Sequence, residues 1–133
     1  MTTDELTQAD EADTDEESRY EEAFRATRRA LDEAIELLML LEHREPDPDA
    51  RSDIGEDLLE LERDREDLVR ANLAFHSGRA VMVPPSQELL DDILANSKEV
   101  VDLTAERATA SAVLKLATDA LAKFAEIQQI GRS

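Results

Sequence analysis

The chain lacks several residue types on which functional sites depend. Its 133 residues include no cysteine and no tryptophan, and only three glycines and four prolines. Without cysteine there is no disulfide, no thiol nucleophile and no thiolate metal ligand. No glycine-rich phosphate loop and no Gly-x-Ser-x-Gly motif occur in the sequence. These absences remove the sequence signatures of many enzyme classes.

Long hydrophobic runs are also missing. No apolar stretch reaches the 18 residues that a membrane-spanning helix requires. The first residues, Met-Thr-Thr-Asp-Glu, lack the basic and apolar regions of a secretory signal. We therefore expect a cytoplasmic protein that makes no membrane contact.

Negative charge is abundant but unevenly distributed. The net charge is -18, and residues 1–22 hold ten acidic residues against one arginine, so half of it lies there. This segment has a single large aliphatic residue after Met1, Leu6, and cannot bury enough apolar surface to offset the cost of ordering. We expect a disordered acidic tail over residues 1–17 and one helical bundle domain over residues 18–133.

Positive charge is scarce and nowhere forms a long stripe. The densest cluster, Arg25, Arg28 and Arg29, has acidic residues four positions away at Glu21, Asp32 and Glu33. Such spacing is typical of an ordinary solvated helix face. Because phosphate binding depends on clustered Lys and Arg, we expect no direct contact with nucleic acid.

Two helices are predicted after the tail. Apolar residues at spacings of three and four predict a first helix from about Ser18 to residues 42–44, which Pro46 and Pro48 end. A second helix begins after Asp47 or at Ser52-Asp53, and Ser77-Gly78 is a signal for a left-handed C-cap. The short connection between them predicts an antiparallel helical hairpin.

The remainder predicts one very long helix. From Ser86 to Ile130 there is neither glycine nor proline, which allows a single helix of roughly 65 Å at 1.5 Å per residue. The predicted fold is therefore all-α: an elongated three-helix bundle or coiled coil, a helical hairpin plus one long C-terminal helix. The hairpin is too short to cover that helix, so we expect a homo-oligomer.

Two apolar segments are candidate interaction sites. One is the alanine-rich distal half of the long helix, with Leu114, Ala117, Leu121 and Phe124, where small residues allow close helix approach. The other is the loop Val81, Met82 and Val83. Each has a purely structural alternative: alanine is the best helix former, and the loop can fold over the end of the bundle.

No catalytic constellation is recognisable. His43 and His76 fall at the ends of different antiparallel helices, too far apart to share a metal ion. Glu-x-x-Glu or Glu-x-x-Asp pairs begin at Glu33, Glu88 and Glu99, a spacing that helical magnesium-dependent hydrolases use. At this frequency of acidic residues such pairs arise by chance, and no consistent Lys or Arg accompanies them. We expect no cofactor and no metal.

The sequence is therefore interpreted as a non-enzymatic protein-protein interaction module. An adaptor, an assembly factor or a secretion-type chaperone that presents a long helical surface would fit. The alternative is an acidic inhibitor or immunity-type protein that neutralises a basic toxin or a nucleic-acid-binding enzyme. The first uses an apolar helical surface and the second uses acidic side chains.

Overall fold

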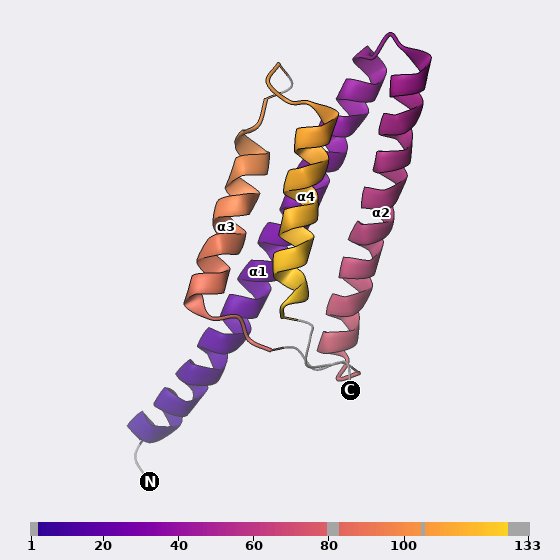
Figure 1. Ribbon diagram of the computed structural model, residues 1–133. Helices are drawn as coiled ribbons and strands as arrows, with labels where there is room; N and C mark the ends of the chain where they lie inside the picture. Colours follow the sequence, from indigo (N-terminus) through magenta and orange to yellow (C-terminus); the bar gives the residue numbers. More distant parts are fainter. Residues whose placement is uncertain (1–2, 80–82, 105, 128–133) are drawn as a thin grey trace.

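The described part of the chain forms four helices. The computed structural model describes residues 3–79, 83–104 and 106–127, with side chains from Glu16 onward. Within these ranges there is no strand, and the helices are α1 (Thr3–Arg44), α2 (Pro48–His76), α3 (Gln87–Asp102) and α4 (Ala110–Ala125) (Figure 1). The all-α prediction is confirmed, whereas the three-helix arrangement is wrong.

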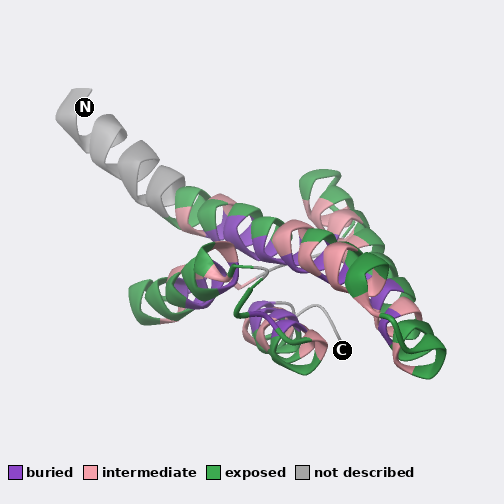
Figure 2. Ribbon diagram, turned by 90° about the horizontal axis from the view of Figure 1, so that it is seen from above, coloured by how far each residue is buried: buried purple, intermediate pink, exposed green. Residues whose placement is uncertain are grey.

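The longest helix, α1, organises the bundle. Successive helices run in alternating directions, so α1 is parallel to α3 and α2 is parallel to α4 (Figure 1). Helix α1 packs against the other three, α3 packs against α4, and α2 contacts α4 only slightly. The buried side chains lie where the helices face one another (Figure 2). The core therefore follows one face of α1, and two of the outer helices are loosely associated.

The predicted long helix is interrupted in its middle. Helix α3 ends at Asp102, and α4 begins after Thr109, whose hydroxyl accepts a hydrogen bond from the backbone N–H of Ala112 at 3.2 Å. Between them the Thr104 carbonyl accepts bonds from the backbone N–H groups of Arg107 and Ala108. A turn thus forms without glycine or proline and reverses the chain.

Burial explains why the chain turns there. Val113, Ala117 and Phe124 are at most 2% exposed, because the reversal lays α4 against α1 and α3. A continuous helix would have carried these side chains beyond the hairpin into water. Burying apolar surface contributes roughly 25 cal/mol per Å², which outweighs the small preference for continuing a helix. The uncovered helix that motivated the oligomer prediction is therefore absent.

The ends of α2 match the predicted signals. Asp47 is its N-cap and Pro48 its first residue. At the other end Gly78 adopts a φ of 75°, and the N–H groups of Gly78 and Arg79 donate to the carbonyls of Phe75 and Ala74. This pair of bonds is the Schellman motif, and its left-handed residue favours glycine. The hairpin of α1 and α2 is thereby confirmed.

Helix α1 extends well beyond the rest of the bundle (Figure 1). Its backbone is helical from Thr3, although residues 1–17 were expected to be disordered. The side chains of residues 3–15 lie outside the described part of the structure. The weak contribution of this segment to stability stays a prediction.

All four aromatic residues other than histidine gather at one end of the bundle. The ring of Tyr20 lies 4.4 Å from that of Phe75 and 6.1 Å from that of Phe124, and Phe124 lies 6.3 Å from Phe24. Helices α1, α2 and α4 each contribute to this cluster. The Tyr20 hydroxyl donates to Asn72 Oδ1 at 2.9 Å, which satisfies its polar atom. The cluster fixes α2 and α4 to the same end of α1.

Candidate protein-binding groove

The predicted interaction residues divide between the core and the surface. Ala117 and Phe124 are buried inside the bundle, whereas Leu114 and Leu121 are half-buried. In the loop before α3, Val83 is half-buried and its N–H donates to the Ile127 carbonyl at 2.9 Å. Val81 and Met82 lie outside the described residues. Only part of the predicted surface is therefore accessible.

Two of the predicted residues, Leu121 and Phe124, line an open groove between α2 and α4. Its residues are Asp64, Asp67, Leu68 and Ala71 of α2 with Leu121, Phe124 and Ala125 of α4. Leu68 and Phe124 are buried and form the floor, while Leu121 and Ala71 are half-buried. We call this the acidic groove. It combines an apolar floor with carboxylates along one edge.

The same arrangement repeats one heptad away along both helices. Asp57 precedes Asp64 by seven residues, and Leu114 precedes Leu121 by seven. Because α2 and α4 are parallel, equal steps keep these pairs in register. Asp57, like Asp64, is half-buried. The row of half-buried aspartates on α2 therefore continues one heptad beyond the groove, about 10 Å at 1.5 Å per residue.

The carboxylates along this edge repel one another. Burial raises the pKa of Asp64, and the charges of Glu60 and Asp67 raise it further. Burial raises the pKa of Asp57 as well, with additional contributions from Glu60, Asp53 and Glu56. Each shift shows that the folded protein disfavours the charged form. A cation placed beside these groups would therefore be stabilised.

No cation of the bundle compensates this edge. In the part of the chain with described side chains, the ion pairs are Arg65 with Asp32 at 3.0 Å, Arg70 with Glu66 at 3.1 Å, and His76 with Glu21. None of them includes Asp57, Glu60, Asp64 or Asp67. Arg65 and Arg70 of α2 thus pair with acidic residues outside this edge.

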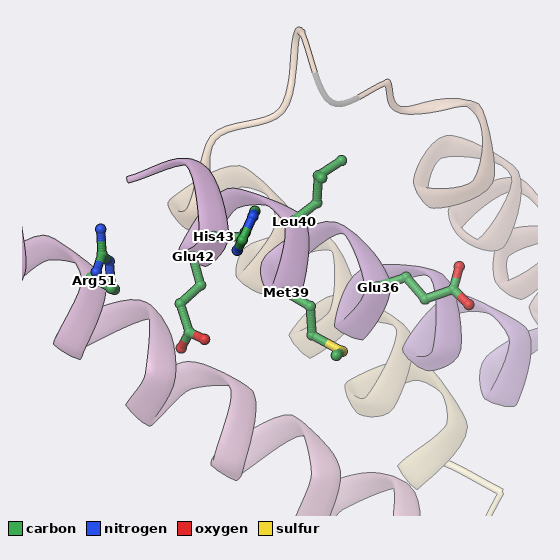
Figure 3. A pocket seen from close by; sticks show the side chains of 6 residues that line it. All are labelled: Glu36, Met39, Leu40, Glu42, His43 and Arg51. Atoms are coloured by element: carbon green, nitrogen blue, oxygen red, sulfur yellow. The ribbon is translucent and has the colours of Figure 1, made fainter. Parts of the chain in front are cut away.

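A second depression lies at the α1–α2 tip (Figure 3). It is lined by Glu36, Met39, Leu40, Glu42, His43 and Arg51. Met39 is 55% exposed. The side chains do not converge, since Leu40 and His43 point away from Met39 and Glu42 (Figure 3). This depression therefore offers no shared binding geometry.

The two histidines lie at opposite ends of the α1–α2 hairpin. His43 is exposed near the end of α1, and His76 is in the last turn of α2. Nε2 of His76 contacts a buried Oε1 of Glu21 that makes no hydrogen bond of normal geometry. Across the described ranges, no group of three or more His, Asp or Glu side chains is arranged to hold a metal ion.

Comparisons with known proteins add no assignment. No model of a protein family, no curated protein and no solved structure matches this chain. None of the helices, over the residues described, has the length and apolar character needed to cross a membrane. The acidic groove is therefore the feature of the molecule that indicates a function.

Sequence analysis missed that two sets of residues share one site. It named Leu121 and Phe124 as interaction residues and no acidic residue of α2 as their neighbour. The structure places them beside Asp64, Asp67, Leu68 and Ala71. The matching seven-residue spacings, Asp57 to Asp64 and Leu114 to Leu121, were the available signal. They acquire meaning only once α4 is known to run parallel to α2.

Proposed function

We propose that this protein is a non-enzymatic interaction module whose acidic groove binds a basic, amphipathic segment of a partner protein. The observation that carries the proposal is the pairing of an apolar floor with uncompensated, partly buried carboxylates in one groove. A helix with leucines on one face and lysines or arginines beside them matches both features. An adaptor or an assembly factor would present such a groove.

The apolar part supplies a surface for such a segment. Leu121 and Ala71 are half-buried in the isolated chain, and Ala125 is exposed. A helix laid between α2 and α4 would cover them and would complete a contact that these two helices barely make with each other. Burial of apolar side chains supplies most of the affinity in helix-in-groove recognition.

The acidic part supplies orientation and selectivity. Charged residues at an interface steer encounter and reject partners of like charge. Burial, and then repulsion from Glu60 and other neighbouring carboxylates, raises the pKa of Asp57 and Asp64, so a basic partner gains the relief of that repulsion as well as direct attraction. An acidic partner segment would be excluded.

A second candidate function uses the same groove. An inhibitor or immunity-type protein would apply the acidic edge to a basic toxin or to a nucleic-acid-binding enzyme. The uncompensated row on α2 favours it, and the groove geometry serves both functions equally. The two candidate functions therefore use the same binding residues. They differ in the identity of the partner and in whether binding inhibits it.

Titration with a designed peptide tests the groove. The probe is an 18-residue helical peptide of lysine and leucine with one apolar face, and a glutamate-leucine peptide is its matched counterpart. We expect the full-length protein to bind only the basic peptide, with affinity that falls as salt rises. In the double variant Asp57→Lys and Asp64→Lys, affinity should fall at least about tenfold, equivalent to about 1.4 kcal/mol.

The matched control reverses the same number of charges elsewhere. Asp91 and Asp92 are exposed on α3, outside the groove. The variant Asp91→Lys and Asp92→Lys changes net charge equally and should bind nearly as well as the natural protein. Equal losses in both variants, with helicity retained, would show attraction to overall charge and would refute the groove as the site.

A further inference from the structure

A second groove, between α1 and α3, has the opposite charge. Its apolar part is formed by Leu94 and Val101 of α3, and its edges carry Arg25 and Arg29 of α1 and Lys98 of α3. Glu22 also lies along it. Arg25, Arg29 and Lys98 are exposed. We call this the cationic groove.

The structure removes the acidic partners that spacing had assigned to this cluster. Glu21 contacts His76 of α2, and Asp32 pairs with Arg65 of α2. Over the described side chains, Arg25, Arg28 and Arg29 take part in no ion pair. Two of the three acids at helical spacing, Glu21 and Asp32, thus engage α2, and the arginines lie on a solvated helix face, as predicted. A concentrated positive charge therefore remains on a chain of net charge -18.

The complementary charge is present on the same chain. Residues 4–17 contain eight acidic residues and no lysine or arginine. Their positions also continue a single helical row: Glu11 and Asp15 precede Ser18, Glu22, Arg25 and Arg29 at steps of three and four. Along this row the residues are acidic at Glu11, Asp15 and Glu22 and basic at Arg25 and Arg29.

Within one molecule these two halves cannot meet. The backbone is helical from Thr3 to Arg44, so the acidic segment continues the axis of α1 away from the groove (Figure 1). At 1.5 Å per residue, Glu11 lies roughly 20 Å along the axis from Arg25. A second copy in antiparallel orientation has no such restriction.

We infer that two copies of this chain form a symmetric dimer in which the acidic residues 4–17 of each copy occupy the cationic groove of the other. The row changes sign between Glu22 and Arg25 and is self-complementary when two α1 helices lie antiparallel, which is the requirement of a twofold interface. Opposing Arg25 to Asp15 and Arg29 to Glu11 of the second copy places the symmetry axis at the level of residue 20, so Ser18 of the two copies lies close to it.

Both copies carry a net negative charge, which opposes dimer formation. Whether the dimer forms depends on where the charges lie. At 0.15 M salt the Debye length is about 8 Å, so repulsion between distant acids is screened while contacts within the groove persist. The dimer should therefore form at moderate salt and dissociate at about 1 M salt, where the contacts are screened as well. Its interface is distinct from the acidic groove, so it stands or falls independently of the proposed function.

Cysteine crosslinking tests the arrangement on the full-length chain, which has no cysteine of its own. Ser18→Cys should form a disulfide-linked dimer rapidly under mild oxidation. The control is Ser52→Cys, since Ser52 is equally exposed but lies on α2. We expect Ser18→Cys to crosslink at least about tenfold faster, the ratio that 1.4 kcal/mol of association energy produces.

Charge reversal identifies the contacts. In the Ser18→Cys background, Arg25→Glu with Arg29→Glu should slow crosslinking about tenfold or more, and adding Glu11→Arg with Asp15→Arg should restore it. Circular dichroism checks that helicity is unchanged, as expected for exposed positions. Equal rates for the two single-cysteine variants, or no effect of the arginine reversal, would overturn the inference. Light scattering that gives 14.9 kDa at every concentration would do so as well.

Discussion

The two grooves of this bundle have similar construction and opposite charge. Each lies between two parallel helices and has leucine in its apolar part, yet one is edged by Asp64 and Asp67 and the other by Arg25, Arg29 and Lys98. They also differ in packing, because α1 and α3 are closely associated whereas α2 and α4 barely touch. The acidic groove can therefore accept an inserted helix more easily. The cationic groove instead offers a surface to a row of charged side chains.

This difference shows how little the net charge says about binding. Helix α2 supplies Arg65 and His76 to α1, where they engage Asp32 and Glu21. Those contacts leave carboxylates uncompensated on α2 and arginines uncompensated on α1. Packing of one helix pair thus separates charge to opposite sides of the molecule. The two surfaces should respond differently to mutation.

The largest expected effect tests whether both grooves belong to one cooperative unit. Phe124 lines the acidic groove and packs against Tyr20 and Phe24 of α1. Phe124→Ala should lower the free energy of unfolding by about 3–5 kcal/mol, because it leaves a cavity in the core. Urea unfolding followed by circular dichroism should remain a single transition.

The control is Leu73→Ala, since Leu73 is 60% exposed and should change stability by less than about 0.5 kcal/mol. Two separate transitions in Phe124→Ala, with α4 melting first, would instead show that the cationic groove is stable without the acidic one. The two grooves would then belong to two independently folding parts of the protein.

Alkaline pH provides the next largest effect, and it acts at the aromatic end that anchors α2 and α4 to α1. Burial, with a smaller contribution from Glu21, raises the pKa of Tyr20 to about 12. The folded state keeps the proton more tightly than the unfolded chain, whose tyrosine has its ordinary pKa near 10. This stability is complete below about pH 10 and is lost as pH rises towards 12, by on the order of 2–3 kcal/mol.

Tyr20→Phe isolates this step. It should cost about 1 kcal/mol at pH 7 through loss of the hydrogen bond to Asn72, and should remove the loss between pH 10 and 12. Thermal melts across that range measure both quantities. An unchanged alkaline step in the variant would assign the effect to lysines or to other groups.

Local signals in the sequence were sufficient for the hairpin. Asp47 with Pro48 marks the start of α2, and Ser77-Gly78 marks its end, because caps and left-handed residues depend on near neighbours. The all-α class follows in the same way from apolar spacing. The ends of α1 and α2 nearest these signals were therefore predictable.

The break between α3 and α4 depends on distant contacts, although the sequence carries a trace of it. The buried row of α3 ends at Val100, and its next positions, Thr104, Arg107 and Ser111, are all polar. In a continuous helix Val113 would lie roughly 220° around the axis from Val100. This change in the direction of the apolar face indicates the turn between α3 and α4. The absence of glycine and proline had instead suggested one continuous helix.

The two grooves could be identified only from the tertiary structure. Spacing along α1 assigned Glu21 and Asp32 to neighbouring arginines, and only the position of α2 shows that His76 and Arg65 take them. Likewise, Asp64 and Leu121 are 57 residues apart and meet because α4 returns beside α2. Competition between local and long-range ion pairs is decided by packing, which sequence spacing does not describe.

A smaller effect distinguishes the acidic edge from an ordinary exposed acid. Asp64→Asn should raise the free energy of unfolding at pH 7 by roughly 0.5 kcal/mol, because it removes a partly buried charge and relieves repulsion from Glu60 and Asp67. Because the folded-state pKa of Asp64 is raised, the natural protein should gain the same stability as pH falls through the acid range. Asp92→Asn on α3 is the control and should change little. Destabilisation by Asp64→Asn would show that its carboxylate has a stabilising partner.

The smallest effect concerns the acidic segment itself. Deletion of residues 1–17 removes eight acidic residues and a single large aliphatic residue after Met1, so it removes little apolar surface from the domain. We expect the melting temperature, measured at a concentration low enough to keep the protein monomeric, to change by no more than a few degrees, about 1 kcal/mol for a domain of this size. At high concentration the natural chain should melt at a higher temperature than the deletion variant, since a ligand that binds only the folded state stabilises it by mass action. A difference in melting temperature that does not depend on concentration would mean that the segment acts within its own molecule. The proposed dimer would then be refuted, whereas the proposed binding of a basic segment in the acidic groove would be unaffected.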